Sequence, residues 1–134
     1  MDRPLGYNPM RWDCEKQGCF NRIKRPKIEV FADCFPGRIS FGDVDGVVEI
    51  DGHFLYLEWK PAQTTIATGQ RILIERRTSD GLSTYLIVAG NAETMQVESY
   101  AIAWNGKLHP WQKASLEDVK ERIRGWVGMV KRNL

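Results

Sequence analysis

The sequence predicts one mixed α/β domain built around a central sheet. Its 134 residues suit a single domain with its own core. Two runs rich in β-branched and aromatic residues flank an Asp-Gly turn, and later segments alternate between strand-like and helix-like patterns. Hydrophobic residues make up 43% of the chain and charged residues 27%, a globular composition that excludes a disordered chain or a coiled coil. The net charge of +2 neither requires nor excludes a nucleic-acid partner.

The domain is expected to span residues 1–134, with an irregular segment over 1–25, a core over 26–104 and a C-terminal helix over 115–131. A short helix over Trp12–Cys19 is an alternative within the first segment. A helix is expected next, because proline suits a first helical turn and Pro36-Gly37 would end it. Its apolar residues follow the spacing of one helix face, although a strand remains possible: Ile28, Phe31, Ala32 and Phe35.

The following block predicts a β-hairpin. Asp51-Gly52 separates two β-rich runs, and Asp-Gly favours a type I′ turn because both central residues need a positive φ. We expect a short preceding strand over Arg38–Phe41, and Pro61 should end the last strand of the group.

The remaining elements complete the α/β order. A helix is expected from Thr68 to a stop at Asp80-Gly81, followed by a buried strand over residues 82–90. A further strand over Thr94–Trp104 leads to a turn at Asn105-Gly106. The C-terminal helix should begin at a capping box that runs from Ser115 to Asp118.

The hairpin turn sets the pairing of the chemistry-bearing residues. If Asp51-Gly52 is a two-residue loop, Asp45 lies opposite Glu58 and Asp43 lies opposite Lys60. Because side chains alternate between the faces of a strand, these four share one face. The other face would carry a core pattern: Val44, Val48, Ile50, Leu55, Leu57 and Trp59.

Two carboxylates directly opposite each other on a sheet repel, which a divalent cation with oxygen ligands would relieve. Lys60 returns to the same face, where it can orient a nucleophilic water or stabilise charge on a phosphate. Such a set of groups suits phosphodiester hydrolysis. The alternative is a solvated hairpin face with cross-strand salt bridges, which does not explain why Asp45 and Glu58 oppose each other.

Asp45 followed by Glu58-Trp59-Lys60 resembles the PD-(D/E)xK nuclease signature. Residues 42–45 resemble its G-x-P-D lead-in, with Val44 in place of proline, and Gln70 resembles the helix glutamine of the VRR-NUC and Holliday-junction-resolvase-like branches. The resemblance covers about Glu29 to Gly90. It implies a restriction-endonuclease-like domain with an αβββαβ core and an added C-terminal helix. It also implies that the protein is encoded by a phage or prophage.

The resemblance also implies roles for individual residues. Asp45, Glu58, Lys60 and Gln70 would be catalytic, and Mg²⁺ or Mn²⁺ would be held by Asp45, Glu58 and Glu29 from the first helix. A solvated glutamate is an equal alternative for Glu29, and an exposed first-turn residue is the alternative for Gln70. Two basic groups are expected to contact DNA phosphates, unless they are simply solvated: Arg22, Lys24, Arg25 and Lys27, and Arg71, Arg76 and Arg77.

The cysteines leave two interpretations open. Cys14, Cys19 and Cys34 could bind zinc if His53 or His109 completed the site, but free thiols fit the odd count and the unusual spacing better. No apolar run reaches the ~20 residues of a membrane span, and the first residues lack a secretory h-region. The expected location is therefore the cytoplasm of a bacterium or a phage-infected cell.

The expected function is Mg²⁺- or Mn²⁺-dependent cutting of DNA, selective for a structure such as a junction or flap. A homodimer would suit cutting two strands. The alternatives are a nuclease directed at RNA and a non-catalytic module on the same fold that binds DNA or a protein, such as a phage inhibitor of a host factor. Intact Asp45, Glu58 and Lys60 favour the enzyme.

Overall fold

The computed structural model describes residues 26–131, and the chain divides into two compact units, Met1–Gly42 and Asp43–Leu134. The single domain predicted from the sequence stays a prediction. The described residues contain three helices and a mixed six-stranded sheet, which together make an α/β protein. None of the described helices is long and apolar enough to cross a membrane.

The described part of the first unit contains a 3₁₀ helix, η2 (Ile28–Cys34), where the sequence predicts an α-helix. The prediction of α-helical geometry is wrong because the apolar stripe meets no packed surface within this segment: no residue of η2 is buried, and Phe31 is 48% exposed. The β-branched side chains of Ile28 and Val30 also lower the preference for an α-helix.

The predicted strand at Arg38–Phe41 is also wrong, because this segment has no regular structure. Gly37 adopts a positive φ of 61°, and the Ile39 N–H donates to the Pro36 carbonyl oxygen, so the chain turns here. Phe41 then packs edge-to-face on Phe35, with ring centroids 5.4 Å apart. The aromatic side chain is thus engaged in a local cluster instead of a strand ladder.

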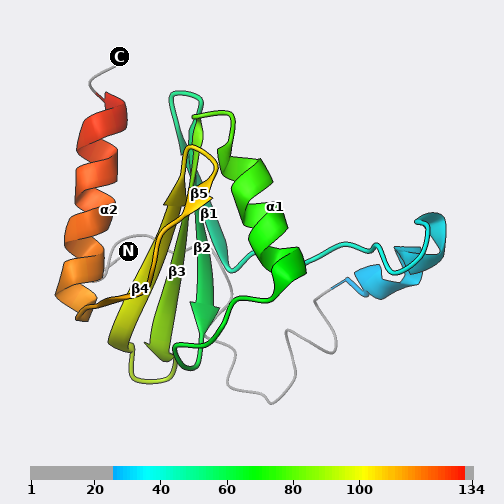
Figure 1. Ribbon diagram of the computed structural model, residues 1–134, viewed down its shortest axis with the longest axis horizontal. Helices are drawn as coiled ribbons and strands as arrows, with labels where there is room; N and C mark the ends of the chain where they lie inside the picture. The colour runs from blue at the N-terminus through cyan, green and yellow to red at the C-terminus, as the bar shows by residue number, and fades with distance from the viewer. Residues whose placement is uncertain (1–25, 132–134) are drawn as a thin grey trace, which may run out of the picture. The chain divides into compact units, whose positions relative to one another are not determined.

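The second unit holds the sheet and two α-helices (Figure 1). Its elements follow in chain order: β1 (Gly46–Ile50), β2 (His53–Lys60), α1 (Thr68–Thr78), β3 (Ser83–Asn91), β4 (Gln96–Trp104), β5 (Lys107–Leu108), β6 (Gln112–Lys113) and α2 (Leu116–Lys131). The strand order is β1-β2-β3-β4-β5, with β6 also paired to β4. Only β2 and β3 are parallel, and α1 makes the crossover between them.

The predicted hairpin is confirmed. Asp51 and Gly52 have φ values of 50° and 82°, the positive values that a type I′ turn needs. Ile50 pairs with His53, and the antiparallel ladder continues to Gly46 opposite Leu57. This is the register that the sequence predicts, so every side chain of the hairpin lies on its expected face.

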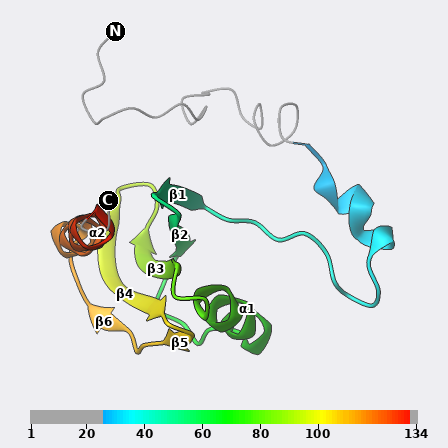
Figure 2. The ribbon, with the colours of Figure 1, turned by 90° about the horizontal axis from the view of Figure 1, so that it is seen from above.

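Helices cover both faces of the sheet, α1 on one side and α2 on the other (Figures 1 and 2). Ile74 of α1 packs with Tyr85 and Ile87, whereas Trp126 and Val130 of α2 pack with alternate residues of the same strands. The predicted apolar face of the hairpin lies on the α2 side, where Leu55 is buried and three others are partly buried: Ile50, Leu57 and Trp59.

Two residues of that predicted core face are exposed. Val44 is 48% exposed and Val48 is 46% exposed. The prediction that they are buried is wrong because β1 is the outermost strand of the sheet order, and Val44 precedes the first residue of β1. A strand at the end of a sheet has neighbours on one side only, so alternation alone does not ensure burial.

Local signals account for the other boundaries. Asn105 and Gly106 form the predicted turn, with φ values of 51° and 81°. The capping box is confirmed in both directions: the Ser115 N–H donates to Asp118 Oδ2 at 2.8 Å, and the Asp118 N–H donates to Ser115 Oγ at 3.2 Å.

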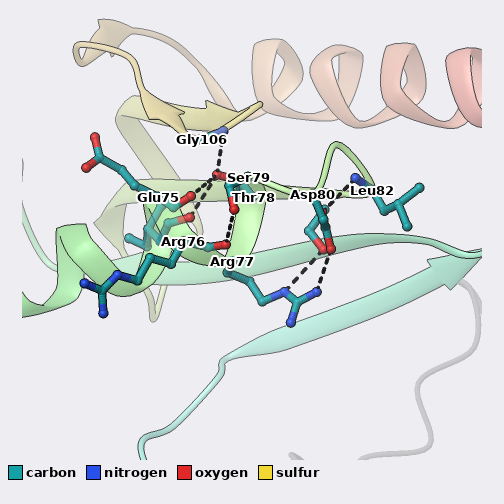
Figure 3. Close-up of polar contacts among 10 residues, drawn as sticks. Glu75, Arg76, Arg77, Thr78, Ser79, Asp80, Leu82 and Gly106 are labelled. Atoms are coloured by element: carbon teal, nitrogen blue, oxygen red, sulfur yellow. Dashed lines mark hydrogen bonds and ion pairs between the residues drawn. The ribbon is translucent and has the colours of Figure 1, made fainter.

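The end of α1 is held by side chains (Figure 3). The buried Thr78 hydroxyl donates to the Ile74 carbonyl oxygen at 2.9 Å and accepts the Gly106 N–H at 3.2 Å. Arg77 forms an ion pair with Asp80 at 2.9 Å. These contacts join the last turn of α1 to the β4–β5 turn and to the start of β3.

Candidate active site

The carboxylate of Asp45 is held against the second strand of the hairpin. The ladder ends at Gly46 opposite Leu57, so Asp45 and Glu58 occupy the next opposed positions. Asp45 Oδ2 accepts the backbone N–H of Trp59 at 2.6 Å. This side-chain hydrogen bond extends the contact between the two halves of the hairpin to the residue before β1, and it leaves the other carboxylate oxygen of Asp45 for a further partner.

The electrostatics of Glu58 show that the predicted charged groups influence one another. Burial is the main cause that raises the pKa of the Glu58 carboxyl above its ordinary value of 4.5, and the charge of Asp45 raises it further. Lys60 lowers this pKa and Asp43 raises it by a smaller amount. Glu58 therefore lies close enough to be influenced by the charges of Asp43, Asp45 and Lys60. The two largest influences, burial and Asp45, disfavour its ionised form.

Tyr85 is a site residue that was not predicted from the sequence. This residue of β3 is opposite Tyr56 of β2 in the parallel register, and their rings stack with centroids 5.2 Å apart and planes 13° apart. Tyr85 is only 4% exposed, and burial followed by the charge of Glu58 raises the pKa of its phenol. It lies on the α1 side of the sheet, the side that also carries Glu58. The position of Tyr85 near Glu58 can be predicted only when the pairing of β2 with β3 is known.

Gln70 lies in the first turn of α1, and its side chain is half-buried. It is one turn before Ile74 and two turns before Thr78, the two buried residues of the helix, so it lies on the face that packs toward the sheet. A seven-residue connection, residues 61–67, joins the end of β2 to the start of α1. The fold therefore places Gln70 on the sheet face shared by Glu58 and Lys60, in the helical turn that follows Lys60 along the chain.

A metal at this site would have two protein carboxylates from the sheet. Within residues 26–131, no group of three or more His, Cys, Asp or Glu side chains is arranged to hold a metal ion. Glu29, the predicted third ligand, lies on η2 in the first unit, and its role stays a prediction. Asp45 and Glu58 fit Mg²⁺, because this ion is commonly held by one or two carboxylates while water and substrate phosphates complete its shell.

The predicted nucleic-acid-binding residues differ in what they contact. Arg22, Lys24 and Arg25 lie outside the described residues, and Lys27 immediately precedes η2. Arg71 Nε forms an ion pair with Glu75 at 3.3 Å, and Arg77 is engaged by Asp80. Arg76 is exposed near the end of α1. The structure thus gives Arg77 a structural contact, and Arg71 and Arg76 are the more accessible of the α1 arginines.

Neither of two cavities in the described part of the chain is lined by Asp45, Glu58 or Lys60. The larger cavity, of about 530 Å³, lies between α2 and the sheet, on the face opposite the carboxylates. The second, of about 450 Å³, is lined by the β2–α1 connection, Arg71, Ala101 and residues 108–111. The candidate active site therefore lies outside both of these cavities.

The cysteine and histidine residues give no metal cluster in the described part of the chain. Cys34 is an exposed free cysteine whose thiol donates to Asp33 Oδ1 at 3.7 Å, while Cys14 and Cys19 lie outside the described residues. His53 is at the hairpin turn, and its Nδ1 is 3.2 Å from the Asp51 carbonyl oxygen. His109 stacks on Trp104 with centroids 5.1 Å apart. The described positions thus supply no support for a zinc site.

Comparison of the chain with protein-family models, with curated proteins and with solved structures found no significant match. The function proposed below is therefore based on the residues of the candidate active site.

Proposed function

We propose that this protein is a Mg²⁺- or Mn²⁺-dependent nuclease of the PD-(D/E)xK type that cuts DNA. The observation that carries the proposal is the opposition of Asp45 and Glu58 at the end of the hairpin, with Lys60 on the same face. The order of a hairpin, a helix with Gln70 in its first turn and a parallel strand supports a restriction-endonuclease-like arrangement.

Each residue has a role that follows from its place. Asp45 and Glu58 would hold the divalent cation, which when bound polarises the phosphate and lowers the pKa of water. The Lys60 ammonium can donate hydrogen bonds to the attacking water or to a phosphate oxygen. Gln70 carries an amide that can donate to a non-bridging oxygen or orient water. Tyr85 contributes a buried phenol that interacts with the charge of Glu58 and so helps to set the environment of that carboxylate.

The substrate class follows from the shape and the charges. The site lies outside the two cavities described above, and the exposed Arg71 and Arg76 can contact the phosphates of a polymer. The unit has few elements beyond the sheet and its two covering helices, so selection of a DNA structure is more economical than reading a base sequence. Junctions and flaps are therefore the preferred candidates, and a homodimer in which each copy cuts one strand belongs to the same proposal.

The test is a cleavage assay on duplex, single-stranded, flapped and four-way-junction DNA, each with Mn²⁺ or with EDTA. Three proteins are compared: wild type, Lys60→Ala and the matched control Lys107→Ala, which removes an exposed lysine from β5. We expect cleavage by wild type and by Lys107→Ala, a loss on the order of 100-fold or more in Lys60→Ala, and none in EDTA. Circular dichroism should show the same fold in all three, because a screened surface charge contributes little stability.

The same assay separates the enzyme from its alternatives. Cutting of an RNA strand in preference to every DNA substrate would redirect the proposal to a ribonuclease. Equal trace cleavage by wild type and Lys60→Ala would indicate a contaminant. If wild type cuts nothing while tight binding to DNA survives in Lys60→Ala, the protein is a non-catalytic binding module.

A further inference from the structure

The cavity beside the start of α1 combines features that select a particular class of ligand. Its volume of about 450 Å³ lies within the range of small-molecule sites. Arg71 contributes nitrogen donors and Thr64 adds a hydroxyl, whereas Leu108 and Trp111 supply an apolar wall. No Asp or Glu is among the residues that line it in the described part of the chain. A ligand that is both anionic and partly flat and apolar would fit this combination.

The start of α1 adds to the preference for an anion. Ala67 at the N-cap provides no side-chain hydrogen bond to the first turn, and that turn contains no acidic residue. The unbonded N–H groups and the positive end of the helix dipole are thus left uncompensated by side chains. Ile66 and Arg71, on either side of the first turn, both line the cavity. The cavity therefore lies beside the positive end of the helix, with Arg71 in its lining.

The walls of the cavity are held in position by contacts within the unit. The Trp111 indole N–H donates to the Thr64 carbonyl oxygen at 3.1 Å, which ties the β2–α1 connection to the segment before β6. The His109 backbone N–H donates to the Ile102 carbonyl oxygen at 2.9 Å, which fixes this part of the lining, while the His109 ring stacks on Trp104 on the α2 side of the sheet. Arg71 uses Nε for Glu75, so the terminal nitrogens of its guanidinium remain the groups that can reach a ligand.

From these features we infer that the cavity binds a nucleotide, with its phosphate near Arg71 and its base against the apolar wall. Arginine suits phosphate because its donors match two oxygens at once. The cavity lies on the same sheet face as the proposed active site: Ala101, in its lining, is in one cross-strand row with Ile87 and Glu58, two strand spacings or about 10 Å across the backbone. Nucleotide binding here does not depend on whether that site cuts DNA.

The test uses the full chain in EDTA, so that no cleavage interferes. Isothermal titration calorimetry measures binding of deoxyadenosine monophosphate (dAMP), of deoxyadenosine and of inorganic phosphate. We expect dAMP to bind at least about tenfold more tightly than either fragment, because only dAMP contacts both parts of the cavity. In a ¹H–¹⁵N spectrum the indole signal of Trp111, assigned with Trp111→Phe, should shift on addition of dAMP.

Variants locate the ligand. Arg71→Gln should weaken dAMP binding by about tenfold or more. The matched control Arg124→Gln, an exposed arginine on α2 that is not in the cavity lining, should change the affinity by less than about twofold. An unchanged melting temperature of Arg71→Gln would show that the lost binding is not a folding defect.

Three results would overturn the inference. Absence of dAMP binding at millimolar concentration would remove it outright. Equal affinity for inorganic phosphate and dAMP would show a simple anion site. If Asp45→Asn abolished dAMP binding while Arg71→Gln left it intact, the nucleotide would occupy the hairpin face instead of the cavity.

Discussion

Replacing Glu58 by glutamine should stabilise the metal-free protein at neutral pH. The Glu58 carboxylate is half-buried, lies opposite Asp45 and has its pKa raised by burial first and by Asp45 second. A group with a raised pKa in the folded state disfavours folding when it is ionised. Glutamine keeps nearly the same shape and hydrogen-bonding oxygen but carries no charge, so Glu58→Gln removes this unfavourable term.

The size of the effect follows from the position of the group. Like charges directly opposite each other on adjacent strands destabilise by roughly 0.2–1 kcal/mol, and partial desolvation adds to this. The repulsion and the desolvation cost are both smaller than these values suggest, because solvent screens a partly exposed carboxylate. The variant also loses the attraction between Glu58 and Lys60, which reduces the gain further. We therefore expect a gain of about 0.5–1 kcal/mol, which corresponds to roughly 2–6 °C in melting temperature for a domain of this size.

The pH dependence has a definite sign. Below about pH 4.5, the ordinary pKa of glutamate, Glu58 is protonated in both folded and unfolded wild type, and the difference between wild type and Glu58→Gln should vanish. As the pH rises through the raised folded-state pKa, wild type loses stability relative to the variant. Above that pKa the difference should remain constant.

The assay is urea unfolding in EDTA at several pH values, followed by tryptophan fluorescence. Glu98→Gln is the matched control, because Glu98 is an exposed glutamate on a strand, and its unfolding free energy should stay within about 0.5 kcal/mol of wild type. If Glu58→Gln is less stable than wild type at neutral pH, or if the difference does not shrink in acid, Glu58 has a stabilising partner and the argument for a strained carboxylate pair fails.

Three further predictions follow from the structure. Mg²⁺ or Mn²⁺ at a concentration tenfold above its Kd should add about 1.4 kcal/mol to the unfolding free energy of wild type and so raise its melting temperature, and Asp45→Asn should lose this increase. An equal shift of both proteins in a thermal scan would refute the metal assignment. Gly90→Ala should destabilise by several kcal/mol in urea unfolding, since a Cβ there would lie 2.2 Å from the Gln96 carbonyl oxygen, and a change below about 1 kcal/mol would contradict this close approach. Ser115→Ala should lower stability by about 1 kcal/mol because the reciprocal cap of α2 is lost, and an unchanged denaturation midpoint would show that the cap is not needed.

The parts of the fold that the sequence predicts correctly depend on neighbours along the chain. The Asp51-Gly52 turn and the period-two alternation together determine the hairpin register, and Ser115 with Asp118 determines the start of α2. These signals are local, so one segment contains all of the information. The same holds for Asn105-Gly106, whose backbone conformation few other residue pairs adopt easily.

The errors arise where burial depends on a distant partner. The apolar stripe of η2 has the right spacing for a helix face, but spacing does not say whether a surface exists for it to cover. Val48 alternates correctly and yet is exposed, because β1 is the last strand in the sheet order. Tyr85 escaped notice for a similar reason: its place near Glu58 depends on the parallel pairing of β2 with β3, which follows from no local pattern.

The surroundings of Glu58 also bear on the choice between a metal site and a simple salt-bridged surface. In a salt-bridged hairpin face, the cation should be the dominant influence on the carboxylate and should lower its pKa. Here burial and Asp45 outweigh Lys60, so the pKa of Glu58 is raised. Asp45 cannot turn away freely, because its carboxylate holds the Trp59 N–H. The hairpin backbone thus keeps two carboxylates together, and among the described residues Lys60 does not offset burial and the charge of Asp45 at Glu58, whereas a bound divalent cation would stabilise the pair.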